Sequence, residues 1–138
     1  METNKDLKRR KRIVLATSDR GVEDSLRKKF SELHYELFTV SRGLEAVTEM
    51  LDHDVDLMIV DLDMTGNVGV DVIPVIRRLR PRMPVVMLAD DVTFQIRKVA
   101  AEQGVTFQTS RPRDHRETHD IVEATEKIIA KRELLTVN

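Results

Sequence analysis

Short apolar runs of the kind found in buried strands alternate five times along this chain with segments of helical spacing. The strand-like runs cover residues 13–16, 35–40, 57–62, 84–89 and 105–109. In the segments that follow them, apolar residues recur every three or four positions, as in amphipathic helices. Strands separated by helices pair in parallel, through right-handed crossovers that place helices on both faces of the sheet. The alternation predicts an α/β doubly wound (βα)5 sandwich, a five-stranded parallel sheet with strand order 2-1-3-4-5.

The helical segments also carry capping signals. We expect Ser41 to cap the second helix, and Asp90 or Asp91 to cap the fourth. Asp114 and Glu117 have the spacing of a capping box at the start of the last helix. The residues expected on inner helix faces are Leu44, Val47 and Leu51 in the second helix, and Ile121, Ala124, Ile128 and Leu135 in the last.

The third strand-like run ends in an aspartate. The run is almost continuously apolar from Leu57 to Val60, which indicates a strand buried on both faces, and Asp61 follows at its carboxyl end. In the predicted order the first and third strands are neighbours where the order reverses, and ligands of open parallel sheets bind beyond the carboxyl ends there. We therefore expect Asp61 to open into a crevice shared with Thr17, Ser18, Asp19, Ala89, Asp90 and Arg111. The alternative is an aspartate that merely ends a strand or caps a helix.

Length and composition limit the remaining possibilities. The 138 residues suffice for one domain, which we expect over 12–138 behind a basic polar leader, 1–11. The chain has no cysteine, which excludes disulfides, thiolate metal sites and thiol nucleophiles. No apolar run approaches the roughly 18 residues of a membrane helix. With a net charge of -1, the chain is expected to be a cytoplasmic globular protein without a membrane partner.

In this order and with these separations, the motifs resemble those of receiver domains in two-component response regulators. The resemblance covers about residues 12–135 and rests on Asp56–Met64 with Gly69 beyond, on Pro84–Leu88, and on Gly104 followed by Pro112. It implies a flavodoxin-like fold and phosphorelay signal transduction without enzymatic activity of its own. It also implies that Asp61 is the phosphoacceptor, which takes a phosphoryl group from a histidine kinase or a phosphotransfer protein.

The expected metal site departs from the family pattern. The family supplies an acidic pair after the first strand to bind magnesium, and the matching residues here are Thr17 and Ser18. Asp19 stands one step further on, and Asp63 matches a position that contributes a backbone carbonyl. Magnesium prefers charged oxygen ligands, so an Mg2+ site built from Asp61, Asp19 and Asp63 is expected to be weak or absent.

Three further positions differ from the family. Ala89 replaces a hydroxyl residue that hydrogen-bonds the phosphoryl group, and Gln108 falls on the place of an aromatic residue, which Phe107 could fill only with a one-residue shift. Arg111 replaces a lysine, and its planar fork can pair two-pronged with a carboxylate or phosphate. We expect Arg111 to bind phosphate or to form a salt bridge with Asp61. The resulting hypothesis is a pseudo-receiver with weakened or lost phosphoryl switching, acting on an output partner through the last two helices and the fifth strand.

Other interpretations stay open. The domain could be purely structural, without phosphorylation. A flavodoxin-type carrier would hold flavin phosphate in the loop 17–21, although the acidic Asp19 repels phosphate. A nucleic-acid module would use the basic segments 8–12 and 77–82, but the near-zero net charge disfavours it. His115 and His119 have the one-turn spacing of metal ligands, and we favour a solvent-facing pair there.

Overall fold

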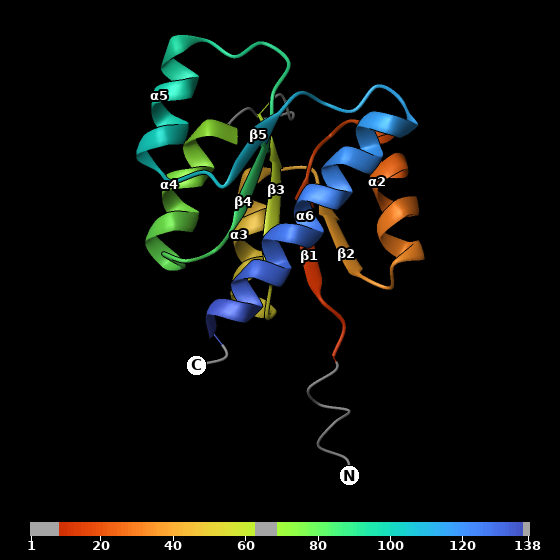
Figure 1. The fold of residues 1–138 in the computed structure, drawn as a ribbon. Coiled ribbons are helices and arrows are strands. Elements are labelled where there is room, and N and C mark those ends of the chain that lie inside the picture. Colours follow the sequence, from red (N-terminus) through yellow and green to blue (C-terminus); the bar gives the residue numbers. More distant parts are fainter. Residues whose placement is uncertain (1–8, 63–68, 137–138) are drawn as a thin grey trace.

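A five-stranded parallel sheet forms the centre of the computed structural model, which describes residues 9–62 and 69–136 (Figure 1). Its strand order is β2-β1-β3-β4-β5, which confirms the prediction. The strands are β1 (Arg12–Ala16), β2 (Glu36–Val40), β3 (Leu57–Asp61), β4 (Val85–Leu88) and β5 (Phe107–Thr109). The helices are α2 (Arg20–Glu32), α3 (Gly43–Asp52), α4 (Gly69–Leu79), α5 (Phe94–Glu102) and α6 (His115–Thr136).

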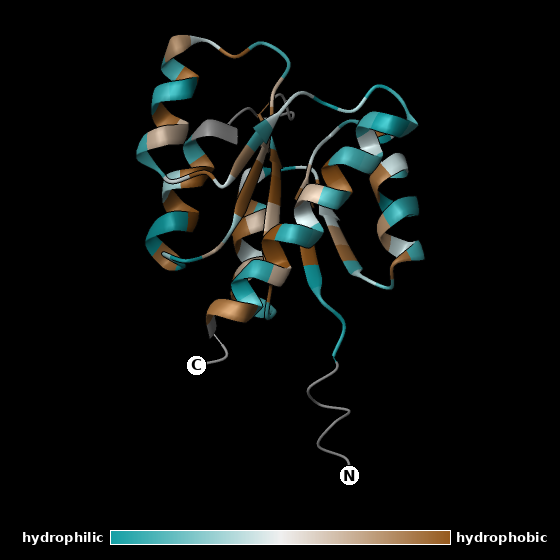
Figure 2. Cartoon of the chain, in the orientation of Figure 1, coloured by the Kyte–Doolittle hydropathy of each residue, from teal (hydrophilic) through white to brown (hydrophobic). Residues whose placement is uncertain are grey.

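Helices cover both faces of the sheet and bury two separate apolar cores. On one face α2 and α6 pack over the strands, and on the other face lie α3, α4 and α5 (Figure 1). Alternate residues of β1 serve the two cores, with Ile13 and Leu15 facing α2 and α6, and Val14 and Ala16 facing the other helices. Figure 2 shows the consequence, since the central strands β3 and β4 are largely hydrophobic and the helices are amphipathic. A sheet buried on both faces explains the nearly unbroken apolar runs in the sequence.

The strand register fixes which residues meet at the carboxyl edge of the sheet. Ala16 of β1 pairs with Val60 of β3, so Thr17 stands level with Asp61. Asp61 in turn pairs with Leu88 of β4. The first and third strands are thus neighbours at the reversal of strand order, and the aspartate lies at that point.

The start of α3 differs from the prediction. Arg42 is the N-cap residue, and Ser41 lies one position outside the helix. The Glu45 carboxylate accepts hydrogen bonds from the backbone amides of both Ser41 and Arg42 at 3.2 Å. The glutamate in the first turn therefore binds the amides of the N-cap residue and of the residue before it, and the Ser41 hydroxyl does not cap this helix.

The predicted inner faces of α3 and α6 are partly wrong. In α3, Ala46 and Met50 are fully buried, whereas Leu44 and Leu51 are 77% and 53% exposed. The small Gly43 and Ala46 allow the helix to lie close to the sheet, and this rotates the larger leucines outward. In α6, Leu135 is exposed because this 22-residue helix extends past the core that Ile121, Val122, Thr125 and Ile129 complete.

The capping box at the start of α6 is confirmed. The backbone amide of Glu117 donates to Asp114 Oδ1 at 2.8 Å. The Glu117 carboxylate accepts from the Arg113 amide, also at 2.8 Å. This fixes the first turn of the helix just after the loop that follows β5, and so determines how that loop approaches β3.

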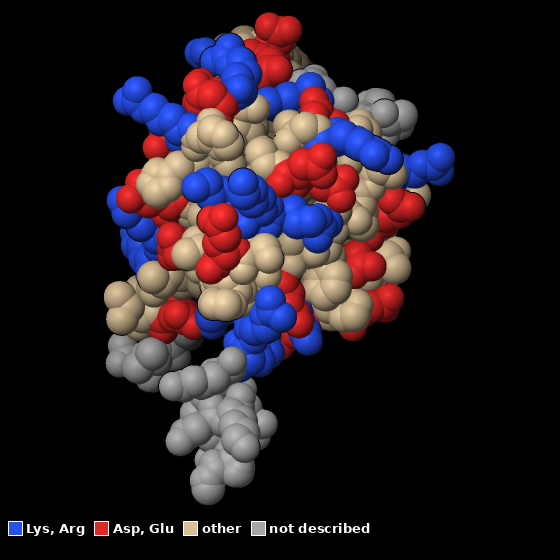
Figure 3. All heavy atoms as spheres, turned by 90° about the vertical axis from the view of Figure 1, so that its right-hand side faces the viewer, with Lys and Arg blue, Asp and Glu red and all other residues tan. Residues whose placement is uncertain are grey.

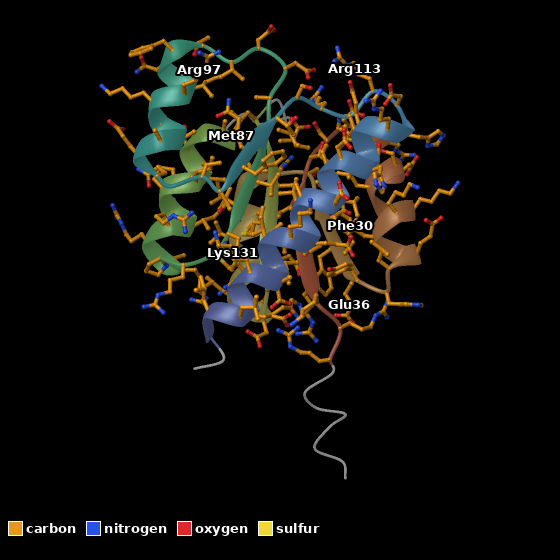
Figure 4. The ribbon with its side chains drawn as sticks, viewed as in Figure 1. Phe30, Glu36, Met87, Arg97, Arg113 and Lys131 are labelled. Atoms are coloured by element: carbon orange, nitrogen blue, oxygen red, sulfur yellow. The ribbon has the colours of Figure 1, made fainter. Side chains whose placement is uncertain are left out.

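Aromatic packing joins α2 to the start of β2. The rings of Phe30 and Tyr35 meet edge to face, with centroids 5.5 Å apart, and Figure 4 shows Phe30 between α2 and α6. Burial raises the pKa of the Tyr35 hydroxyl above its ordinary value of 10.0, and the carboxylates of Glu126, Glu133 and Asp56 raise it further. The tyrosine hydroxyl is therefore held in its neutral form in the folded protein.

The outward rotation of the α3 leucines can be tested with two substitutions in one helix. We expect Met50→Ala to lower the free energy of unfolding by about 2–5 kcal/mol, because it opens a cavity in the core. Leu44→Ala should change it by less than about 0.5 kcal/mol, because this side chain is exposed. Urea unfolding followed by circular dichroism measures both. Equal losses for the two variants would contradict the observed face.

The raised pKa of Tyr35 can be read directly, since the chain has one tyrosine and no tryptophan. We expect the tyrosinate absorbance of the folded protein to appear with a midpoint above pH 10, and that of the urea-unfolded chain near pH 10. The group therefore stabilises the fold fully below pH 10, and this contribution is lost as the pH rises through the folded-state pKa. A folded-state midpoint at or below 10 would refute the burial of this hydroxyl.

Candidate functional site

Asp61 is a fully buried carboxylate with a two-pronged arginine partner. It is the last residue of β3, and its side chain has 0% exposure. Nε of Arg111 donates to both carboxylate oxygens at 3.1 Å, and Nη2 lies 3.0 Å from Oδ2. The salt bridge that the sequence suggested is therefore present. The guanidinium supplies positive charge directly at the carboxylate, where the low dielectric of the interior strengthens the pairing.

The burial of Asp61 corrects one expectation. We expected the carboxylate to open into a crevice, but it has no exposed surface. The neighbouring cavity, about 610 Å³, is lined by Asp19, Asp90 and Arg111 among others, and Asp61 is not part of its wall. Arg111 both contacts the Asp61 carboxylate and lines this cavity. An arginine from the loop after β5 thus joins the buried carboxylate to the wall of the cavity.

Thr17 is the second partner of Asp61. Its hydroxyl donates to Oδ2 of Asp61 at 2.6 Å and accepts a hydrogen bond from the Asp19 amide at 3.1 Å. The threonine is itself buried, with 2% exposure. Sequence reasoning treated Thr17 only as the loss of a metal ligand and missed this bond. The available signal was its register, one residue beyond β1 and level with Asp61.

Two aspartates position Arg111. Its backbone amide donates to Oδ1 of Asp90 at 3.0 Å, and its Nη1 lies 3.5 Å from Oδ2 of Asp19. Asp90 does not cap α5 as expected, because Thr93 is the N-cap and accepts from the Ile96 amide at 3.2 Å. The carboxylate of Asp90 instead joins the loop after β4 to the loop after β5.

The residues expected at a metal site are only partly brought together. Oδ1 of Asp19 accepts from the Val22 amide at 3.0 Å and so caps α2, while its other oxygen faces Arg111. Ser18 is exposed, and Asp63 lies outside the described residues. Within residues 9–62 and 69–136, no three acidic or histidine side chains form a group that could hold a metal ion. His115 and His119 lie exposed on α6.

The other substituted positions lie beside the site. Ala89 is buried directly after β4 and donates its backbone amide to the Thr109 carbonyl. Gln108 pairs with Met87, whereas Phe107 packs into the core under α2 and α6. Because neighbouring strand residues point to opposite faces, Phe107 and Gln108 cannot exchange places without a register shift. The match of the family's aromatic position to Gln108 stays a prediction.

Many basic side chains of segments 8–12 and 77–82, which a nucleic-acid-binding module would use, form hydrogen bonds or ion pairs within the protein. Arg9 lies 3.3–3.4 Å from the carboxylates of Asp54 and Asp56. The Arg77 guanidinium donates to four backbone carbonyls, those of Pro81, Met83, Gln103 and Gly104. Burial lowers the pKa of this guanidinium below its ordinary value. Lys8 lies outside the described residues. Figure 3 shows acidic and basic side chains interspersed on the face it presents, which carries no single-sign patch.

Comparison with known proteins decides the family. Residues 13–123 match the family described as the response regulator receiver domain. The chain belongs to this family. The resemblance seen in the sequence is thereby confirmed, and the family is one of two-component signalling modules that are generally not catalytic. In the described part of the chain, no helix is both long and apolar enough to cross a membrane.

Curated relatives are longer than this receiver domain. It is 28% identical over 111 residues to the DNA-binding transcriptional regulator NtrC of Azospirillum brasilense, a match over 80% of this chain and 23% of the relative. It is also 28% identical over 102 residues to the transcriptional regulatory protein GlrR of Escherichia coli K12, a match over 74% of this chain and 23% of the relative. The chain thus spans about a quarter of the length of these relatives.

Solved structures share the fold at low sequence identity. A CheY-like receiver domain from Methanospirillum hungatei matches with a TM-score of 0.82 and 18% identity, covering 91% of this chain and 98% of that one. The response regulator TrrA of Thermotoga maritima, solved in complex with Mg2+ and beryllium fluoride, matches with a TM-score of 0.68 and 22% identity, covering 83% and 97%. These similarities confirm the flavodoxin-like receiver fold.

The pairing of Arg111 with Asp61 predicts a large stability effect. Arg111→Met should lower the free energy of unfolding by about 2–4 kcal/mol, because it leaves a buried carboxylate without its cation. The double variant Arg111→Met, Asp61→Asn should recover part of this loss, because the uncompensated charge is gone. Arg113→Met, in the same loop but with a 75% exposed side chain, serves as the control and should not shift the urea midpoint. No difference between Arg111→Met and the control would contradict this view of the site.

Proposed function

We propose that this chain is a receiver domain of phosphorelay signalling in which an internal arginine takes the place of the metal ion. Asp61 matches the family's phosphoacceptor, but its magnesium binding and phosphoryl switching are weakened or lost. The observation that carries the proposal is the contact of the Arg111 guanidinium with both oxygens of a fully buried Asp61. Output then depends on protein–protein contacts that do not wait for phosphorylation.

The described residues do not fit a magnesium ion at this site. Mg2+ requires near-octahedral coordination by oxygen ligands and several bound waters. The acidic pair after the first strand is replaced by the hydroxyls of Thr17 and Ser18, and Thr17 already donates to Asp61. Asp19, which we expected as a ligand, caps α2 and faces Arg111. A cation entering there would meet a fixed positive charge within hydrogen-bond distance of its main ligand.

The same contacts oppose attack by Asp61 on a phosphoryl group. A nucleophilic carboxylate needs an accessible oxygen in line with the transferred phosphorus. Both oxygens of Asp61 accept hydrogen bonds from Arg111, and Oδ2 also accepts from Thr17. Phosphorylation would require the Arg111 guanidinium to move away from Asp61. The buried carboxylate would then lack its cation, which is unfavourable next to the apolar core. Ala89 removes the hydroxyl that would bond the product.

The proposed partners follow from the family and from the faces left available. A histidine kinase or phosphotransfer protein would dock at the carboxyl edge of the sheet, beside the cavity that Arg111 lines. An output protein would contact the face formed by α5, β5 and α6. We assign this role to a domain over residues 12–138, preceded by the basic leader 1–11. We propose no enzymatic activity of its own and no nucleic-acid or membrane partner.

Intact-mass spectrometry after incubation with a small phosphodonor and magnesium tests the proposal. We expect little or no phosphoryl addition to the natural sequence. A variant carrying Thr17→Asp, Ser18→Asp, Ala89→Thr and Arg111→Lys restores the family residues, and we expect it to gain one phosphoryl group in a magnesium-dependent reaction. Adding Asp61→Asn to this variant should abolish the gain.

A folding control and one contrary result make the outcome decisive. Circular dichroism establishes that each variant is folded before labelling. Stoichiometric, magnesium-dependent phosphorylation of the natural sequence, lost in Asp61→Asn, would overturn the claim that Arg111 disables the switch. It would leave the family and the fold untouched.

A further inference from the structure

A groove of about 730 Å³ lies at the end of the sheet opposite to Asp61. Its walls are the segment before β4, the residue before β5 and the last turns of α6. The lining residues are Arg82, Pro84, Thr106, Lys127, Ile128, Lys131, Arg132 and Leu135. Figure 4 shows the separation, with Arg113 near the start of α6 at the Asp61 end and Lys131 towards the far end of the helix. The groove is therefore independent of the phosphorylation site.

Every charged residue that lines the groove is basic. Arg82, Lys127 and Lys131 are exposed, and none of the three has a hydrogen bond or ion pair with a described residue. Arg132 is different, because its guanidinium donates to the Asp56 carbonyl at 2.9 Å and so forms a fixed part of the wall. The neighbouring acid of α6, Glu133, is paired with Lys11 and does not line the groove. The groove thus concentrates positive charge in a protein whose net charge is -1.

The groove also has an apolar floor. Pro84, Ile128 and Leu135 contribute it, and Leu135 remains 73% exposed although it lies on a helix that packs against the sheet elsewhere. Leu135 thus adds to an apolar strip beside three cations that have no partner among the described residues, a combination suited to a contact. Among the described residues, the lining includes no aromatic side chain on which a nucleic-acid base could stack.

We propose that this groove binds an acidic amphipathic segment of a partner protein. Apolar side chains along one face of the segment would cover Ile128 and Leu135, in the helix-in-groove mode of peptide recognition. Its carboxylates would then meet Lys127 and Lys131 on one rim and Arg82 on the other. The cations orient and attract the segment, while the apolar floor supplies contact area. This binding does not require Asp61 or Arg111, and it rests on the proposed function only in that it gives the α6 and β5 part of the output face a partner of stated chemistry.

Nuclear magnetic resonance titration of the full chain tests the proposal. The probe is a synthetic amphipathic helix of about four turns, with leucines on one face and glutamates on the other. We expect its addition to shift the amide signals of Thr106 and residues 127–135. Lys127→Glu together with Lys131→Glu should weaken binding by about tenfold or more. Leu135→Ser should weaken it too, and this exposed position keeps the variant folded.

Matched controls separate the groove from general electrostatics. Lys28→Glu with Lys98→Glu makes the same charge change at exposed lysines on α2 and α5, and should alter affinity by less than about twofold. A peptide of identical composition in scrambled order should bind more weakly. Three results would each overturn the proposal: shifts that map elsewhere, equal effects of the two lysine pairs, or tighter binding of a single-stranded oligonucleotide or anionic vesicles. Because Asp61 is untouched, none of these results bears on the phosphorylation experiment.

Discussion

A buried negative charge is the constraint on which the carboxyl edge of this domain depends. Asp61 has no exposed surface and sits at the end of a strand whose other residues are apolar and buried. An isolated carboxylate in such a place would be strongly destabilising, so the fold must provide a cation, hydrogen bonds or both. Arg111 provides the cation and Thr17 a short hydrogen bond. The loops around the site are arranged so that these two groups reach the same two oxygen atoms.

Holding the arginine there links elements that are distant in sequence. The Asp90 carboxylate fixes the backbone of Arg111, and Asp19 meets its outer nitrogen while capping α2. In this way β3, the loop after β4, the loop after β5 and the start of α2 share one network of charges. The network would have to open for a metal or phosphoryl group to enter. Since its members depend on one another, opening it costs more than the loss of any single bond.

The sequence was sufficient to predict the fold because its pattern reflects the sheet. Runs such as 57–60 are apolar at every position, as expected of a strand that is covered on both faces. Their alternation with helices favoured a doubly wound parallel sheet. The same reasoning failed on α3, where hydrophobicity favoured Leu44 and Leu51. Close approach of the helix to the sheet instead selected the small residues Gly43 and Ala46. How large a side chain can be at a helix–sheet contact depends on how closely the two elements approach. Helical periodicity in the sequence gives no information on this distance.

The sequence predicted which residues meet at the site better than it predicted how they bond and how deeply the carboxylate is buried. Topology brought Asp61, Thr17 and Arg111 to one edge, and the chemistry of guanidinium favoured the salt bridge. The closure of the carboxylate, the bond from Thr17 and the role of Asp90 depend on how far side chains reach across loops. Asp90 illustrates this. An aspartate a few residues before a helix is a candidate N-cap, but α5 begins after Thr93, which is the actual cap. The Asp90 carboxylate therefore accepts the Arg111 amide instead.

The two ends of the sheet differ in how their charges are used, and this difference bears on how such a domain can signal. At the carboxyl edge the Arg111 cation is paired internally, so the site that would change state in a switching receiver is already neutralised by the protein itself. At the amino edge Arg82, Lys127 and Lys131 have no described partner and flank exposed apolar surface. Ligands shift an equilibrium only through groups that they contact differently in its two states. Under the proposed function, recognition therefore falls to surfaces whose charges have no partner among the described residues, and the groove at the amino edge is the surface that we propose for it.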